Sequence, residues 1–113
     1  MVYQSVDVGR VFHALSDATR RDIVQRLKTA PQSVSTLAEP YRMSLPALTK
    51  HLAVLEAAGL VRTSKTGRIR QCALATDALK AAAAWLSDYE EFWTDRLDAL
   101  EAHLSETNRE DHP

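Results

Sequence analysis

The stretch SLPALTKHLAVLEAAGLV, residues 44–61, leads directly into RTSKTGRIRQCAL, residues 62–74. Ser44 is a typical helix N-cap, and Pro46 falls in the first turn, where its missing N–H is harmless. Gly59 is the kind of residue that ends a helix. Between these signals, apolar residues recur at helical spacing: Leu48, Leu52 and Leu55. The pattern predicts an amphipathic helix with one face in the core.

The opposite face of this helix carries small, hydroxyl-bearing and cationic side chains. Pro46, Lys50 and Ala53 lie at its centre on a helical wheel, and Ala47, Thr49 and His51 flank them. A face of this kind fits the groove of a nucleic acid, although a merely solvated face is the alternative. The residues that follow the helix favour the groove.

A basic hairpin is predicted after the helix. Two segments, Leu60 to Lys65 and Arg68 to Leu74, flank Thr66-Gly67, where glycine supplies the positive φ of a tight turn. The two-stranded ribbon concentrates cations that suit phosphate oxygens and the edge of a minor groove: Arg62, Lys65, Arg68 and Arg70.

Charge is segregated along the chain. Residues 42–75 hold six Lys or Arg against one Asp or Glu, whereas residues 76–113 hold three against ten. The net charge of −1 therefore conceals a basic middle segment. A DNA-binding domain needs a basic face rather than a basic total.

Length and composition predict one domain over residues 1–113, with 45% hydrophobic residues for its core. The sequence has no apolar run of membrane-spanning length, and the start MVYQSVDVGR lacks the apolar core of a signal peptide. Cys72 is the single cysteine, which excludes an internal disulfide and predicts a small buried side chain. These features predict a cytoplasmic protein without a membrane partner.

Three further helices are expected before the basic segment. The first spans residues 8–16, Asp17 caps the second, and Ser35 caps a short third one after a polar break at residues 29–33. Residues 34–58 then form a helix-turn-helix, and residues 60–74 form its wing. The expected fold is mainly α with a two-stranded β-wing, a winged helix-turn-helix in the order α-α-α-α-β-β-α.

A long final helix is predicted over residues 77–106. Its apolar stripe exceeds what a small core covers, so we expect it to form a homodimer together with the first helix. An internal core helix is the alternative. The predicted interface residues are Val8, Val11, Phe12, Trp85, Leu86, Tyr89, Trp93, Leu97, Leu100 and Leu104.

Three segments resemble one known family in the same order and spacing, the ArsR-type winged helix-turn-helix regulators. They are ALSDATRRDIVQRL at residues 14–27, MSLPALTKHLAVLEAAGLV at 43–61 and WLSDYEEFWTDRLDALEAHL at 85–104. The last resembles a branch not known for metal sensing. Two residues depart from the family pattern: Ala18 replaces a frequent proline, and Leu45 stands where many members carry a glutamine that can read a base.

The resemblance implies a homodimer that binds a roughly palindromic double-stranded operator and represses transcription, often of its own gene. The recognition helices would read successive major grooves while the wings reach the flanking backbone or minor groove. The candidate DNA-binding residues are Ser44, Pro46, Ala47, Thr49, Lys50, His51, Arg62, Lys65, Arg68 and Arg70.

Metal sensing is the first alternative, because many family members release DNA when they bind metal. The segment TLAEPYRM, residues 36–43, lacks the paired cysteines of a thiolate site. A second family site corresponds to Glu90, Phe92, His103 and Glu106, where Phe92 replaces a coordinating histidine. We therefore predict no metal and no cofactor, with Glu90, His103 and Glu106 as residual candidates for a metal-responsive derepressor.

Two other function classes compete with DNA binding. Catalysis is disfavoured because no glycine-rich phosphate loop and no recognisable nucleophile with its base are present. A protein-interaction dimer that has lost DNA binding is disfavoured by the basic wing. The operator, the controlled genes and any effector are not specified by the sequence.

Overall fold

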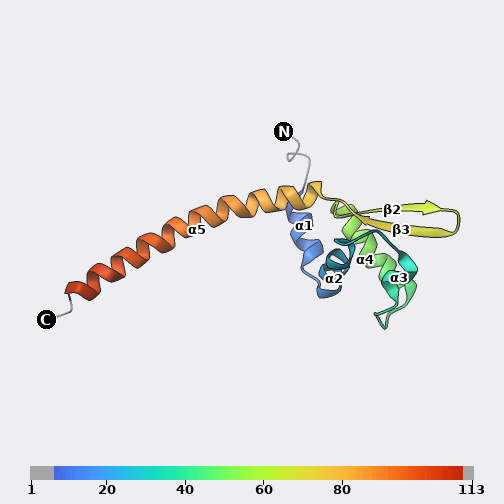
Figure 1. Ribbon diagram of the computed structural model, residues 1–113, viewed down its shortest axis with the longest axis horizontal. Coiled ribbons are helices and arrows are strands. Elements are labelled where there is room, and N and C mark those ends of the chain that lie inside the picture. Colours follow the sequence, from blue (N-terminus) through green and yellow to red (C-terminus); the bar gives the residue numbers. More distant parts are fainter. Residues whose placement is uncertain (1–6, 111–113) are drawn as a thin grey trace. The chain divides into compact units, whose positions relative to one another are not determined.

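The computed structural model describes residues 7–110, with side chains through Thr107. Its described residues form two compact units, one up to Ala82 and one from Ala83 onward. The elements, drawn in Figure 1, are α1 (Val8–Leu15), α2 (Ala18–Leu27), β1 (Gln32–Ser33), α3 (Val34–Ala38), α4 (Leu45–Ala57), β2 (Val61–Thr66), β3 (Ile69–Leu74) and α5 (Asp77–Glu110). The proposed single domain over 1–113 also includes residues 1–6 and 111–113, which lie outside the described part.

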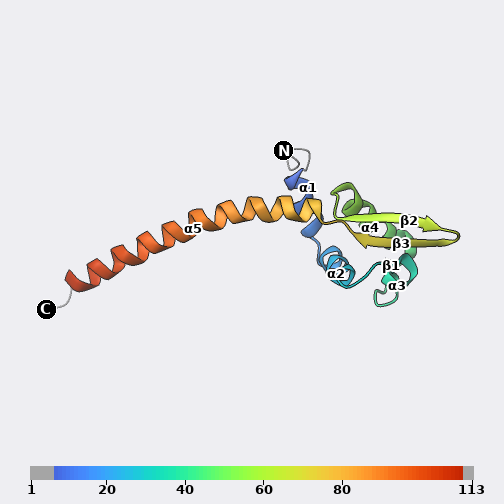
Figure 2. The same cartoon turned by 45° about the horizontal axis from the view of Figure 1, so that its top comes forward.

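The order of helices and wing strands agrees with the expected winged helix-turn-helix, but the sheet has a third strand. β1 pairs antiparallel with β3 on the side away from β2, with Gln32 opposite Cys72 and Ser33 opposite Gln71 (Figure 2). The expected two-stranded wing is confirmed as β2 and β3, and β1 is an additional strand that the sequence did not predict. A strand of two residues is too short to show the alternation that reveals strands in a sequence.

Side-chain caps begin the helices. Asp17 caps α2 as predicted, accepting a hydrogen bond of 3.0 Å from the Arg20 N–H, and Ser44 caps α4 as predicted. The cap of α3 is Ser33, which accepts from the Thr36 N–H at 3.1 Å, and not Ser35. Because β1 holds Ser33 in an extended conformation, its hydroxyl is already placed to cap the next turn.

The end of α4 positions the start of the wing. Gly59 has a φ of +78°, and the N–H groups of Gly59 and Leu60 donate to the carbonyls of Glu56 and Leu55, both at 2.9 Å. This is a Schellman ending, which glycine adopts without steric cost. It carries Leu60 into the core, where it is fully buried.

The core of the first unit is built on the inner face of α4. Leu48, Leu52 and Leu55 are at most 1% exposed, as the spacing predicted. Around them pack fully or almost fully buried residues from the surrounding elements: Val11 and Ala14 of α1, Ile23 and Leu27 of α2, Leu37 of α3, Val61 of β2 and Cys72 of β3.

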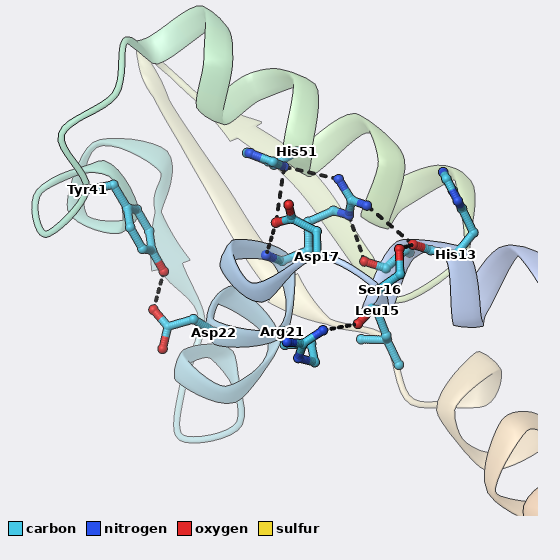
Figure 3. Close-up of polar contacts among 10 residues, drawn as sticks. His13, Leu15, Ser16, Asp17, Arg21, Asp22, Tyr41 and His51 are labelled. Atoms are coloured by element: carbon cyan, nitrogen blue, oxygen red, sulfur yellow. Dashed lines mark hydrogen bonds and ion pairs between the residues drawn. The ribbon is translucent and has the colours of Figure 1, made fainter.

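Two side chains tie α2 to the helix-turn-helix. The Arg26 guanidinium donates to the Leu37 carbonyl at 2.8 Å and to the Thr36 carbonyl at 3.1 Å, both on α3. The Tyr41 hydroxyl, in the turn after α3, donates to the Asp22 carboxylate (Figure 3). Burial, assisted by this contact with Asp22, raises the pKa of Tyr41 above its ordinary value.

The second unit is the part of α5 from Ala83 onward, and large apolar side chains stand exposed along it. Leu86, Trp93, Leu97, Leu100 and Leu104 are each at least 50% exposed. At about 100° per residue they fall within one stripe about 80° wide, together with Tyr89. No described helix, α5 included, is long and apolar enough to cross a membrane.

The two remaining helix ends differ slightly from expectation. α1 ends at Leu15, one residue before the predicted 16, and α5 runs to Glu110, beyond the predicted 106. At the first end, Ser16 leaves the helix because the next residue, Asp17, is extended as the cap of α2. At the second, residues after 106 are polar but contain no helix-breaking residue before Pro113.

We predict that Leu48→Ala lowers the free energy of unfolding by about 2–5 kcal/mol, because it leaves a cavity in the core of the first unit. Leu45→Ala is the matched control on the same helix. Leu45 is 53% exposed, so its truncation is expected to change stability by no more than about 0.5 kcal/mol. Urea denaturation at one protein concentration measures both variants, and equal losses would contradict this account of the core.

Candidate nucleic-acid interface

The outer face of α4 is free of core contacts. Pro46, Lys50 and Ala53 are exposed along its centre, while Ala47 and Thr49 are half-buried at its margin. The division into inner and outer faces follows the sequence pattern. Ser44, at the start of the helix, is also exposed, and its hydroxyl accepts from the Ala47 N–H at 3.2 Å. The first turn of α4 therefore presents its capping residue and Pro46 to a partner.

His51 lies at the margin of this face, where it contacts the start of α2 (Figure 3). Arg20 Nη1 lies 3.2 Å from His51 Nδ1, and the Asp17 carboxylate lies 3.8 Å from the same nitrogen. Because Arg20 has only donors, its contact with Nδ1 is a hydrogen bond when Nδ1 carries no proton, whereas the Asp17 contact is an ion pair when the ring is protonated. In both states Nε2 carries a proton. Nε2 points away from this cluster in Figure 3, so its N–H is left to face a partner.

Arg20 joins three elements, and sequence analysis did not single it out. Its Nε donates to the Ala14 carbonyl at 2.7 Å, and its Nη2 donates to the His13 carbonyl at 3.3 Å. These carbonyls belong to α1, whereas His51 belongs to α4. Arg20 therefore holds the recognition helix against α1 and α2. No local signal in the sequence distinguishes it from Arg21, whose side chain donates to the Leu15 carbonyl at 2.8 Å.

The hairpin turn lies one residue later than the sequence suggested. Thr66 pairs with Ile69, which leaves Gly67 and Arg68 as the two turn residues. Gly67 has a φ of +62°, and Arg68 has no positive φ. A glycine at the first of two loop positions is the requirement of a type II′ hairpin, which needs positive φ only there. The predicted turn Thr66-Gly67 was therefore shifted by one position.

The register of the hairpin places two like charges directly opposite each other. Lys65 of β2 pairs with Arg70 of β3, and both are exposed. Residues opposite in an antiparallel pair share one face of the sheet, and like charges in this arrangement repel. An anion between them removes that repulsion. The pair is thus a favourable position for a phosphate group.

A groove of about 620 Å³ separates the start of α4 from β3. It brings together candidates from the helix and the wing that lie about twenty residues apart in sequence: Thr49, Arg68 and Arg70. It also contains side chains that sequence analysis left out of the candidate set, namely Ser33, Ser35, Leu45, Ile69 and Gln71. Ile69 and Gln71 are two residues apart on β3, and this strand alternation is the only sequence feature that could have indicated them.

Arg62 lies apart from the other hairpin cations. It pairs with Ala73 near the base of the hairpin, and it lines a separate hollow of about 480 Å³ together with Arg10, Glu56 and Asp77. The structure therefore does not bring Arg62 together with the other three hairpin cations. Two carboxylates, those of Glu56 and Asp77, line the same hollow.

Cys72 is fully buried between the strands and the core, as expected. Burial raises the pKa of its thiol, an effect that the Arg70 charge only partly offsets. A buried thiol with a raised pKa is a poor nucleophile and a poor metal ligand at neutral pH.

Comparison with known proteins identifies the family. The pattern of a helix-turn-helix domain family matches residues 15–64. The HTH-type transcriptional regulator Rv2034 of Mycobacterium tuberculosis is 41% identical over 95 residues, which cover 84% of this chain and 84% of that protein. The structure of the ArsR family transcriptional regulator RHA00566 is 43% identical, with a TM-score of 0.72, and the match covers 76% of this chain and 89% of that one. The chain belongs to the ArsR family of winged helix-turn-helix transcriptional regulators.

Two more similarities bear on this ArsR-family protein. The transcriptional repressor SdpR of Bacillus subtilis is 29% identical over 82 residues, covering 73% of this chain and 91% of that protein. The homodimeric winged helix-turn-helix DNA-binding domain Mb0332 of Mycobacterium bovis is 25% identical with a TM-score of 0.59, covering 75% of this chain and 81% of that one. The expected function class, a DNA-binding transcriptional regulator, is confirmed. The family is one of regulators rather than enzymes.

The metal candidates of this ArsR-family chain lie along α5. Glu90 and His103 are thirteen residues apart on the helix, a rise of about 20 Å. Within residues 7–110 of one chain, no group of three or more His, Cys, Asp or Glu gathers closely enough to hold a metal. A site of the kind considered above therefore requires ligands from two chains.

We predict that the Asp17 cap makes the stability of the ArsR-family fold depend on pH. The hydrogen bond from the Arg20 N–H, with a smaller contribution from His51, lowers the pKa of Asp17 below its ordinary value of 3.8. A lowered folded-state pKa stabilises the fold fully above the unfolded value, and the stabilisation disappears as pH falls through the folded value.

Asp17→Asn is the matched variant, because asparagine also caps helices but does not titrate. Urea midpoints measured between about pH 5 and about pH 3 should fall further for the wild type than for the variant. Parallel curves would contradict the assigned role of the Asp17 carboxylate.

Proposed function

We propose that this protein is a homodimeric repressor that binds a roughly palindromic operator. In this proposal α4 enters the major groove, and the β2–β3 hairpin follows the flanking backbone toward the minor groove. The observation that carries the proposal is the groove between α4 and β3, because it joins Thr49 to Arg68 and Arg70 in one concave, cationic surface. A DNA strand presents phosphates along a convex edge, which such a surface complements.

The residues of this surface divide into two roles. Lys50 and Thr49, with Ser44, Pro46 and Ala47 in the first turn, face the base edges and the nearest phosphates. Lys65, Arg68 and Arg70 hold the backbone, and an operator phosphate relieves the repulsion between Lys65 and Arg70. His51 contributes its Nε2–H, in an orientation that Arg20 sets. Arg62 contacts DNA only at the margin, since it lies at the base of the hairpin.

The dimer is proposed from the apolar stripe on α5. A helix whose large side chains are half exposed along five turns is costly to hydrate, and a second copy of the chain covers them in a symmetric pairing. The stripe consists of Leu86, Tyr89, Trp93, Leu97, Leu100 and Leu104. The similar domain Mb0332 is described as homodimeric, which supports the same assembly here. Trp85, Val8 and Phe12 extend the proposed interface.

Val11 does not belong to the proposed interface. It was predicted there from its place on the first helix, but its side chain is fully buried in the core of its own chain. A side chain without exposed surface has none to offer a second subunit. Val8 and Phe12, on the same helix, are half-buried and keep some.

In this proposal the dimer represses transcription by occupying the promoter, which does not require catalysis. Two recognition helices related by a twofold axis occupy adjacent major grooves, and a bound dimer excludes polymerase from the promoter. The similarity to the repressor SdpR supports repression over activation. The acidic α5, with most of the negative charge of the chain, is expected to face away from the DNA. The proposed place of action is the bacterial cytoplasm, where the promoter lies.

The test is a fluorescence anisotropy titration of a labelled duplex from the region upstream of the gene, against a scrambled duplex, at two salt concentrations. We expect a preference of about a thousandfold or more for the native duplex, with a steep salt dependence. Equal binding to both duplexes would contradict autoregulation. Absence of binding to either would favour the protein-interaction dimer.

We predict that Lys50→Ala and Arg68→Ala weaken binding to native and scrambled duplexes alike, because each removes a phosphate contact. Each should reduce the slope of log K against log salt by about one. Lys80→Ala is the matched control, since it removes the same charge from the exposed side of α5. Unchanged titrations for Lys50→Ala and Arg68→Ala would remove both residues from the interface.

We predict that Leu97→Asp dissociates the dimer, because it places a charge in the centre of the apolar stripe. Light scattering coupled to size exclusion should show a mass near 12.6 kDa for the variant and twice that mass for the wild type. Ala102→Asp adds the same charge to the opposite side of the helix, at about 100° per residue, and should stay dimeric. A dimeric Leu97→Asp would show that α5 does not form the interface.

A further inference from the structure

Two large apolar side chains stand exposed on the surface of the first unit, and both line the same groove. Leu45 is 53% exposed at the first position of α4, and Ile69 is 55% exposed on β3. Among described residues up to Ala82, no other large hydrophobic side chain is as exposed as Leu45 and Ile69. Thr49, Arg68 and Arg70 line the groove beside them. Apolar side chains in a groove that also holds arginines suggest contact with something other than phosphate.

We propose that Leu45 is a specificity-determining residue that reads the 5-methyl group of a thymine in the major groove. The inference rests on the proposed operator binding. The N-terminal residues of a recognition helix are those that reach base edges, and Leu45 is the first residue of α4. Leucine has no hydrogen-bonding group, so the thymine methyl is the one feature of a base edge that it can recognise.

The neighbouring side chains support Leu45 over other candidates for this contact. The side chains of Pro46, Ala47 and Ala53 extend less far from the helix than that of Leu45, and Lys50 carries a charge that favours phosphate. Ile69 lies next to the hairpin turn, on the wing side of the groove. Its place suits packing against a deoxyribose, which all nucleotides share. Leu45 is thus expected to confer base preference, whereas Ile69 is expected to confer affinity without preference.

The expected size of the effect follows from the burial of one methyl group. Burial of a methyl-sized apolar group contributes about 0.8 kcal/mol, which corresponds to about a fourfold change in affinity. A symmetric dimer makes the contact twice, once in each half-site. Removing the methyl from both half-sites therefore weakens binding about sixteenfold.

The experiment begins with selection of tight duplexes from a library with a random central segment, using the wild-type protein. Each thymine of the selected duplex is then replaced by deoxyuridine, which keeps the base pair and removes only the methyl group. Anisotropy titrations compare the wild type with Leu45→Ala and with Ile69→Ala. Both variants change exposed side chains, so their folding is preserved.

We expect one thymine, at equivalent positions in the two half-sites, whose replacement weakens wild-type binding about fourfold per site. The same replacement should leave binding by Leu45→Ala unchanged. Ile69→Ala should bind all duplexes more weakly but keep the loss on methyl removal. A second selection with Leu45→Gln should change the preferred base at that position, because an amide reads adenine.

Three outcomes would overturn the inference. The first is a selected duplex in which no thymine methyl affects wild-type binding. The second is a methyl effect of equal size in Leu45→Ala, and the third is an unchanged base preference in Leu45→Gln. Failure of the proposed function looks different, because the wild-type protein would then enrich no sequence from the library.

Discussion

Burial of one face of α4 against the rest of the first unit is the constraint on which the structure depends. Leu48, Leu52 and Leu55 have almost no exposed surface, and a helix cannot rotate about its axis without moving such residues out of the core. The rotation of α4 is thereby set, and so is the identity of its outer face. Lys50 and Thr49 lie away from the core because the three leucines occupy the inner face.

Polar contacts around α2 add to the positioning of the helices that core packing provides. Arg26 binds two carbonyls of α3, and Arg20 joins α1 to His51 of α4. Three of these contacts are charge-assisted hydrogen bonds to backbone carbonyls of α1 and α3, and the contact with α4 is made to the His51 ring. A shift of an ångström in the recognition helix misaligns every base contact at once. Arg20 and Arg26 therefore hold α4 and α3 in place beside α2, although neither lies on the outer face of α4.

The fold was largely predictable because its signals are local. A cap, a glycine and a 3.6-residue period each act within a few residues, so α4 and the cap of α2 followed from Ser44, Gly59 and Asp17. The errors lie where a contact is distant in sequence. β1 exists because Ser33 pairs with Gln71, and the same pairing moves the cap of α3 to Ser33. The turn at Gly67-Arg68 depends on strand register, which a single glycine does not specify.

The sequence by itself determined the element order, the two faces of α4, the basic hairpin and the apolar stripe on α5, since periodicity and charge are properties of the linear chain. Only the tertiary structure decided which of those side chains meet. It joined Thr49 to Arg68 and Arg70 across one groove and exposed Leu45 and Ile69 within it. It also separated Arg62 from the other hairpin cations and buried Val11. The physical reason is that a side chain's surroundings depend on packing between distant segments, which no local pattern encodes.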